Sequence, residues 1–198
     1  MNTVQVLVIA GSARSGSFNQ QLAGVAAGAA LQAGAAVTPV DLRALDLPVY
    51  DADLEARGMP SGARELRRLF AAHDALLLAT PEYNGFPTPL LINALDWASR
   101  PVAEDGLPAG MAAMSGTVAG LLSASPGAFG GIRSLLHTRQ FLQMNLGMLV
   151  VPQQFGLGQA GTAFDASGGL IDAKALASVT AVVQAVLKTA AALKAAAD

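Results

Sequence analysis

A loop rich in glycine and serine follows the first apolar segment of the chain. Residues 11–19 read Gly-Ser-Ala-Arg-Ser-Gly-Ser-Phe-Asn. The serines and Asn19 offer neutral hydrogen-bond donors, and Arg14 adds a positive charge with no acidic neighbour in the loop. An Ala-rich helical pattern begins directly afterwards, and the N-terminus of a helix binds anions through its free N–H groups. This composition predicts a site for a phosphate ester.

The spacing of the glycines excludes the two common nucleotide-binding loops. Neither G-x-x-x-x-G-K-[ST] nor G-x-G-x-x-G is present, so a mononucleotide is favoured over ATP or a dinucleotide. A plainer interpretation stays open for this loop alone. Residues 11–19 could be an ordinary turn with Ser17 as the helix N-cap, and Arg14 a solvated surface charge.

Two further loops have unusual compositions. Residues 81–89 read Pro-Glu-Tyr-Asn-Gly-Phe-Pro-Thr-Pro, a stiff aromatic segment that could hold a flat ring. Residues 123–131 read Ser-Ala-Ser-Pro-Gly-Ala-Phe-Gly-Gly, where glycines allow close approach of a ligand and Phe129 could form a wall or lid.

The elements that should position these loops can be predicted from alternating strand and helix patterns. These patterns predict an α/β, three-layer sandwich around a five-stranded parallel sheet with the flavodoxin-like order 2-1-3-4-5. The predicted strands are Val4–Ala10, Ala36–Leu42, Ala75–Thr80, Thr117–Ser123 and Met148–Pro152. The predicted helices are Asn19–Gln32, Ala63–Ala72, Leu90–Ser99, Gly131–Asn145 and Ala173–Ala196, with longer loops at 48–62, 101–116 and 153–169.

The three unusual loops follow predicted strands 1, 3 and 4. In an open parallel sheet, ligands bind beyond the carboxyl ends of the strands, at the point where the strand order reverses. We therefore expect residues 11–19, 81–88 and 123–131 to converge on one site.

Composition narrows the class of protein. A chain of 198 residues fits a single domain, residues 1–198. Twelve basic and 14 acidic residues give a net charge of −2, which offers no basic face for nucleic acid. The absence of cysteine excludes disulfides, thiolate metal sites and a cysteine nucleophile. His73 and His137 have no metal-like partner nearby in sequence, so we expect capping or surface positions and no metal.

The N-terminal residues do not have the composition of a secretory signal. The chain enters its first strand without a basic, apolar leader, so we expect a cytoplasmic protein. The uncharged stretch Gly106–Ile132 contains Pro108 and Pro126 and many small residues. A buried central strand explains that stretch better than a membrane span.

Taken together, three motifs over roughly residues 4–152 resemble the NAD(P)H-dependent FMN reductase family, which includes bacterial chromate, quinone and azo-dye reductases. The motifs are Gly11-Ser-x-Arg14-x-x-Ser17-Phe18-Asn19, Pro81-Glu82-Tyr83-Asn84 and Asn93-Ala-x-Asp96-Trp97-x-Ser99-Arg100. The loop Ser125-x-Gly127-x-x-Gly130-Gly131-x-Arg133 is similar as well.

The resemblance implies a bound FMN and an NADPH or NADH donor. It implies phosphate contacts from Ser12, Arg14, Ser17, Phe18 and Asn19, and isoalloxazine contacts from Pro81, Glu82, Tyr83, Asn84 and Gly85, with Ser125 and Gly127 closing the third side. Arg100 matches a position implicated in contact with the nicotinamide nucleotide. Homodimers or homotetramers are also implied.

Two positions depart from the family pattern. Ile92 stands where many members have lysine, and Pro87-Thr88-Pro89 replaces a Pro-Gly after the Tyr-Asn loop. These departures bear on nucleotide preference and substrate range more than on FMN binding.

The implied reaction passes a hydride from NAD(P)H through FMN to quinones, azo compounds, free flavins or metal oxyanions. No side chain need act as acid, base or nucleophile. We expect Glu82 to be structural, tied to backbone donors or a subunit contact. Trp97 could lie in the core or at a dimer interface, and Arg100 could cap its helix.

Two other functions remain open on sequence grounds. One is a flavodoxin-type electron-transfer module without a nicotinamide site, although the [ST]-x-T-G-x-T loop and the strong acidity of such modules are missing. The other is a mononucleotide-binding protein without redox function, such as a hydrolase, which no paired carboxylates or metal-ligand clusters support.

Overall fold

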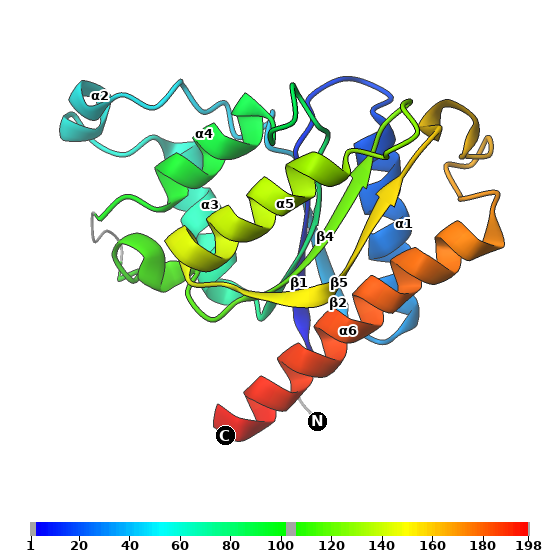
Figure 1. Cartoon of the computed structure of the whole chain (residues 1–198). Coiled ribbons are helices and arrows are strands. Elements are labelled where there is room, and N and C mark those ends of the chain that lie inside the picture. The colour runs from blue at the N-terminus through cyan, green and yellow to red at the C-terminus, as the bar shows by residue number, and fades with distance from the viewer. Residues whose placement is uncertain (1–2, 102–105, 198) are drawn as a thin grey trace.

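A parallel sheet of five strands forms the centre of the molecule (Figure 1). The computed structural model describes residues 3–101 and 106–197. Its strands are β1 (Gln5–Ala10), β2 (Ala36–Val40), β3 (Ala75–Ala79), β4 (Val118–Ala124) and β5 (Leu149–Leu157). They lie in the order β2-β1-β3-β4-β5, and every neighbouring pair is parallel, which confirms the predicted flavodoxin-like topology.

Helices cover both faces of this sheet (Figure 1). On one face lie α1 (Phe18–Gln32) and α6 (Ala173–Ala197). On the other lie α3 (Ser61–Ala72), α4 (Pro89–Ala98) and α5 (Ile132–Gln140). Successive strand residues point to opposite faces, so β1 divides its side chains between two cores. Val6 and Val8 pack under α1 and α6, whereas Leu7 and Ile9 pack on the opposite face.

Parts of the predicted pattern were wrong in detail. A short helix, α2 (Ala52–Ala56), interrupts the segment predicted as a surface loop, and Asp51 caps it by accepting from the Asp53 N–H. The predicted helix 131–145 divides into α5 and a π-helical turn, η2 (Phe141–Asn145). Two 3-10 turns, η1 (Gly110–Ala113) and η3 (Ala160–Thr162), lie in other predicted loops.

Strand β5 is longer than predicted because a bulge accommodates its proline. Ala119 pairs with Val150, but Leu121 pairs with Gln154, so β5 carries extra residues at this point. Proline is tolerated at bulges and on edge strands such as β5, where its missing N–H leaves no ladder bond broken. Arg139 on α5 donates to the Val151 carbonyl at 2.9 Å and to Gln154 Oε1 at 3.0 Å. This arginine supplies the donors that the bulged backbone lacks.

The last helix is long and rich in alanine. By length and composition alone, Ala173–Ala196 is one helix among the described residues that could cross a membrane. In the fold its valines pack against the sheet, with Val179, Val182 and Val186 almost fully buried. The uncharged stretch that contains β4 is likewise a buried strand, as predicted.

Candidate functional site

A cavity of about 220 Å³ opens beyond the carboxyl ends of β1, β3 and β4. All three predicted loops contribute to it, which confirms their convergence. The residues that line it are Ser12, Arg14, Ser17, Phe18, Asn19, Pro81, Glu82, Tyr83, Ala124, Ser125 and Pro126. Asn84, Gly85 and Gly127, which the sequence also places at the site, do not line this cavity.

The first loop presents an unusual run of free backbone donors. Within the described part of the chain, no acceptor is bonded to the N–H groups from Ser12 to Gly16. Ser17 then caps α1, and its hydroxyl oxygen accepts from the Asn19 N–H at 3.2 Å. The Ser17 hydroxyl hydrogen remains available to a ligand. Consecutive free N–H groups ahead of a helix N-terminus suit a phosphate ester, the ligand predicted for this loop.

One cation faces this cavity among the residues that line it. Arg14 is exposed, and its guanidinium donates to the Ser15 carbonyl at 3.2 Å. The guanidinium carbon lies 5.3 Å from the centre of the Phe18 ring, within the range of a cation–π contact. No carboxylate pairs with Arg14 among the described residues, so its charge is free for an anionic ligand.

Asn19 has a structural task as well as a place in the lining. Its side-chain nitrogen donates to the Ala124 carbonyl at 2.9 Å, and its oxygen accepts from the Ala124 N–H at 2.9 Å. The residue is 3% exposed. These paired bonds fasten the start of α1 to the end of β4, so they fix the first loop against the third.

The second loop contains a tight turn that the sequence reading missed. Tyr83 and Phe86 exchange backbone hydrogen bonds of 2.9 and 3.0 Å around Asn84 and Gly85. Both central residues have positive φ, +55° and +88°, as a type I′ turn requires. The Asn84-Gly85 pair is the sequence signal that could have predicted this turn. The turn carries Asn84 and Gly85 at its tip and leaves Tyr83 at the cavity wall.

Glu82 links the second loop to helix α5. Its carboxylate accepts from the Arg133 N–H at 3.2 Å and forms an ion pair with the Arg133 guanidinium. The hydrogen bonds and charge of Arg133 lower the pKa of Glu82 below its ordinary value. A carboxylate at a helix N-terminus is stabilising, so the structural role expected for Glu82 is what the geometry shows.

The unusual Pro87-Thr88-Pro89 segment starts helix α4. Thr88 is the N-cap, accepting from the Leu91 N–H, and its hydroxyl donates to the Gly11 carbonyl at 2.7 Å. Pro89 occupies the first helical turn, where its missing N–H has no cost. Gly11 must be small, because a Cβ there would lie 2.6 Å from Thr80 Oγ1. Thr88 therefore joins the first and second loops.

The third loop is held close to β5. Ser125 Oγ accepts from the Gly127 N–H at 3.2 Å, and Ser123 Oγ donates to the Gly130 carbonyl at 2.5 Å. Gly130 has a φ of +60°, and a Cβ on it would lie 2.5 Å from the Gly156 carbonyl carbon. Phe129 is 81% exposed and does not line this cavity, so it forms no wall here, and its role as a lid stays a prediction.

Arg100 is not brought to this cavity. It lies just beyond the C-terminus of α4, whereas Thr88 and the second loop lie at the N-terminus. Its guanidinium donates to the Asp96 carbonyl at 2.7 Å and packs over the Tyr50 ring at 4.6 Å. The helix-capping alternative therefore describes what Arg100 does within one chain, and it borders a separate cavity with Asp96.

Trp97 belongs to the core. It is fully buried with Met59 and Ala63, and its indole N–H donates to the Pro48 carbonyl at 2.8 Å. Asn93 also donates to Pro48, at 2.9 Å. The family-like Asn-Ala-x-Asp-Trp segment thus fastens the chain before α2 onto α4. Burial raises the pKa of Asp96, the charged residue of that segment.

The two histidines have structural surroundings. His73 ends α3, with its ring nitrogens 2.6 Å from the Leu69 carbonyl and 2.8 Å from Thr38 Oγ1. The ring of His137 stacks on Phe86 with centres 4.3 Å apart. No cluster of metal-ligating side chains is found in the part of the chain that the structure describes.

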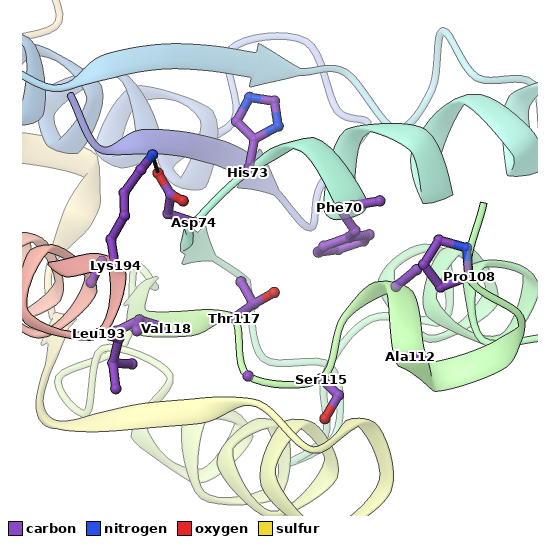
Figure 2. A pocket seen from close by; sticks show the side chains of 14 residues that line it. Phe70, His73, Asp74, Pro108, Ala112, Ser115, Thr117, Val118, Leu193 and Lys194 are labelled. Atoms are coloured by element: carbon purple, nitrogen blue, oxygen red, sulfur yellow. Dashed lines mark hydrogen bonds and ion pairs between the residues drawn. The ribbon is translucent and has the colours of Figure 1, made fainter. Parts of the chain in front are cut away.

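A second, larger hollow lies at the opposite edge of the sheet. Its volume is about 320 Å³, and Phe70, Thr117 and Lys194 contribute to its walls (Figure 2). Lys194 lies beside Asp74 at one side of the hollow, and their charges pair at 2.8 Å. This hollow sits at the amino ends of the strands, away from all three loops, and its charges neutralise each other. The loop cavity is therefore the stronger candidate for function.

Known proteins resemble this chain along most of its length. An NAD(P)H-dependent FMN reductase from Pseudomonas aeruginosa is 39% identical over 178 residues, covering 87% of each chain. A quinone reductase from Pseudomonas putida is 34% identical over 168 residues, covering 84% of each. In structure, the flavoenzyme NAD(P)H:(acceptor) oxidoreductase FerB from Paracoccus denitrificans has a TM-score of 0.80 at 27% identity, covering 95% of this chain and 97% of its own.

The sequence model of a single family extends across all three loops of the cavity. It matches residues 4–162, from the start of β1 to the end of η3. That span contains the free N–H groups of the first loop, the Tyr83 turn and the glycines of the third loop. With these relatives and this topology, the chain belongs to the NADPH-dependent FMN reductase family.

Proposed function

We propose that this protein is an FMN-dependent oxidoreductase that passes a hydride from NADPH or NADH through FMN to quinones, azo compounds, flavins or metal oxyanions. The observation that carries the proposal is the row of N–H groups from Ser12 to Gly16 that have no acceptor among residues 3–101 and 106–197, beside an Arg14 that has no acidic partner there, in the shared cavity of three loops. Family membership supports the same reaction.

The phosphate end of the cofactor would lie on the first loop. The free N–H groups, the Ser12 and Ser17 hydroxyls and Arg14 would hold it, with Phe18 beneath the arginine. Asn19 would contribute chiefly by keeping α1 against β4. These donors suit a dianionic phosphate because every one is neutral or positive.

The ring end of the cofactor would lie between the second and third loops. Pro81, Tyr83 and Ser125 line the cavity there, with the Asn84–Gly85 turn and Gly127 adjoining it. The N–H groups of Glu82, Asn84 and Gly85 have no acceptor within the described residues. They are available to the polar edge of a flat ring, where preorganised donors stabilise developing negative charge.

FMN, when bound, supplies the hydride chemistry. The protein's own residues bind it, orient it and leave one side open to small molecules. Glu82 stays ionised at neutral pH, because Arg133 lowers its pKa, so it has no proton to donate to substrate. This agrees with a reaction in which no side chain serves as general acid or base.

A homodimer or homotetramer would complete the open side of the site. Large apolar side chains are exposed on the second loop and on α5: Tyr83, which lines the cavity, is 53% exposed, Phe86 is 57% exposed and Leu136 is 59% exposed. We also assign the enzyme to the cytoplasm, where the nicotinamide donors are available. Light scattering tests the assembly: a clean monomer that retains FMN would contradict it.

Initial-rate kinetics test the reaction itself. FMN-loaded protein should oxidise NADPH or NADH with a benzoquinone acceptor, and double-reciprocal lines at several quinone concentrations should be parallel. Donor and acceptor would then use one open site in turn. Intersecting lines would contradict the shared site, and FMN-loaded protein with no nicotinamide oxidation would favour the flavodoxin-type electron-transfer module.

A further inference from the structure

A loop outside the three predicted site loops packs against the candidate phosphate site. It follows η3, and its Phe164 lies just beyond residues 4–162, the span shared with the family. The rings of Phe164 and Phe18 are nearly parallel, at 5° between planes, with centres 6.4 Å apart. An offset stack of this kind fixes the orientation of both rings.

Phe18 in turn carries the cation of the site. The Arg14 guanidinium lies over the Phe18 ring, and both side chains line the cavity, whereas Phe164 does not. Arg14 is exposed, and within the described part of the chain its guanidinium has one hydrogen bond, to the neighbouring Ser15 carbonyl. The ring of Phe18 is therefore its main support, and a rotation of that ring would move the guanidinium.

The loop that bears Phe164 is ordered by its own hydrogen bonds. Asp165 Oδ1 accepts from the N–H and the hydroxyl of Ser167 at 2.8 and 2.6 Å, and from the Gly169 N–H at 3.0 Å. Phe164 and Leu170 face each other as an antiparallel bridge. Phe164 thus contacts Phe18 from a turn that its own hydrogen bonds hold in place.

We propose that Phe164 is a positioning residue for the cofactor phosphate, acting through Phe18 on Arg14. This inference rests on the proposed function, because it assigns the anion at Arg14 to the phosphate of FMN. The stack would hold the guanidinium over the free N–H groups of the first loop before ligand arrives. Preorganisation of this kind raises affinity by lowering the cost of ordering the side chain on binding.

The inference predicts a selective loss. Riboflavin has the same ring system as FMN but lacks the phosphate, so Arg14 has nothing to contact in it. Phe164→Ala should raise the Kd for FMN roughly two- to five-fold, the range of an exposed cation–π contact, and leave the Kd for riboflavin unchanged. Phe164→Tyr, which keeps the ring, should retain the wild-type preference for FMN.

Fluorescence titration of the apoprotein with FMN and with riboflavin tests this. Leu170→Ala is the matched control, because Leu170 packs on the same core from the same turn, keeps its backbone bridge to Phe164 when its side chain is shortened, and does not line the cavity. It should lower stability without changing the ratio of the two affinities. If Phe164→Ala does not fold, Phe164→Leu keeps apolar volume, removes the ring face and should shift the ratio in the same direction.

A double-mutant cycle gives the sharper readout. In an Arg14→Ala background, Phe164→Ala should have no further effect on FMN affinity. Equal losses for FMN and riboflavin, or additive losses in the cycle, would reduce Phe164 to general packing and overturn the inference. A wild-type protein that does not prefer FMN over riboflavin would instead contradict the proposed function on which the inference depends.

Discussion

At the scale of single residues, the site contains two kinds of side chain: those available to a ligand and those that hold the loops together. Arg14 has no acidic partner among the described residues and faces the cavity. Glu82, Asn19 and Thr88 instead direct their side-chain bonds to Arg133, Ala124 and Gly11, which lie on other loops or elements. The two groups should respond differently to substitution.

Arg14→Ala should weaken FMN binding without unfolding the protein. A hydrogen bond to a charged group is worth about 1.5–3 kcal/mol, so the Kd for FMN should rise roughly 10- to 150-fold. Riboflavin binding should not change. Arg57→Ala is the matched control, since Arg57 is also exposed but lies at the end of α2. Unchanged FMN affinity in Arg14→Ala would place the phosphate elsewhere.

Glu82→Gln should lower stability in a pH-dependent way. Arg133 lowers the pKa of Glu82 in the folded protein, so the stabilisation is complete above the pKa of the unfolded carboxyl. It is lost as pH falls through the lower pKa of the folded state. The variant should therefore unfold more easily at pH 7, by about 0.5–1 kcal/mol, and match wild type near pH 2.

Denaturant titrations at several pH values measure this difference. Glu65→Gln is the control. Glu65 and Arg68 form an exposed ion pair within one helix, α3, so this pair does not join separate elements. The Glu65→Gln variant should change stability less. A gap between Glu82→Gln and wild type that is the same at both ends of the pH range would contradict an ionic origin.

At the scale of elements, a few hydrogen bonds place the loops relative to one another. Asn19 joins the start of α1 to the end of β4, Thr88 joins the start of α4 to the end of β1, and Glu82 joins the second loop to α5. Each bond crosses between segments far apart in sequence. These bonds therefore fix the first turns of α1, α4 and α5 relative to the three loops, and so maintain the shape of the cavity.

Asn19→Ala should be strongly destabilising. It would leave both the N–H and the carbonyl of Ala124 buried without a partner, at about 1–3 kcal/mol each, for a total of about 2–6 kcal/mol. Urea unfolding measures the loss. Gln20→Ala is the comparison, since Gln20 makes one partly buried bond to the Ser12 carbonyl. Equal losses in the two variants would contradict the special role of Asn19.

Much of this arrangement follows from local sequence. Continuous apolar runs such as Leu76–Leu78 identify buried parallel strands, and their alternation with helical patterns gives the strand order. The three loops could be predicted because small and polar residues directly follow three of those strands. The turn at Asn84–Gly85 also had a local signal, the Asn-Gly pair, that would have placed both residues at a hairpin tip.

Other features depend on contacts between distant segments. The extension of β5 past Pro152 needs a bulge and the donors of Arg139, neither of which strand propensity records. Arg100 lies near the motif of α4 in sequence, but the length of that helix separates it from the second loop. The stack of Phe164 on Phe18 joins residues whose proximity only the folded loop creates.

At the scale of the whole molecule, the candidate site and the ion pair that holds the last helix lie at opposite edges of the sheet. The loop cavity lies at the carboxyl ends of the strands, and Lys194 reaches Asp74 at the amino ends (Figure 2). Asp74 also accepts from the Gln5 N–H at 2.8 Å. The ion pair thus joins α6 to the start of β1 and of β3, away from the candidate site.

Lys194→Met should lower stability by about 1 kcal/mol and leave FMN affinity unchanged. Both partners are 26% exposed, so the loss should shrink as salt concentration rises. Thermal unfolding at low and high salt measures it. Lys188→Met, at an exposed position of the same helix, should have no comparable effect. A fall in FMN affinity for Lys194→Met would show that the two edges are coupled.

The central claim is that the three-loop cavity binds FMN and that nicotinamide nucleotides reduce it there. The most direct test is the visible spectrum of the purified protein reconstituted with FMN, recorded anaerobically before and after NADPH and NADH. We expect retained flavin absorbance that bleaches within seconds of adding at least one nucleotide, and the faster nucleotide identifies the donor. Retained flavin that does not bleach would contradict the reductase, and no retained flavin would contradict the cavity itself.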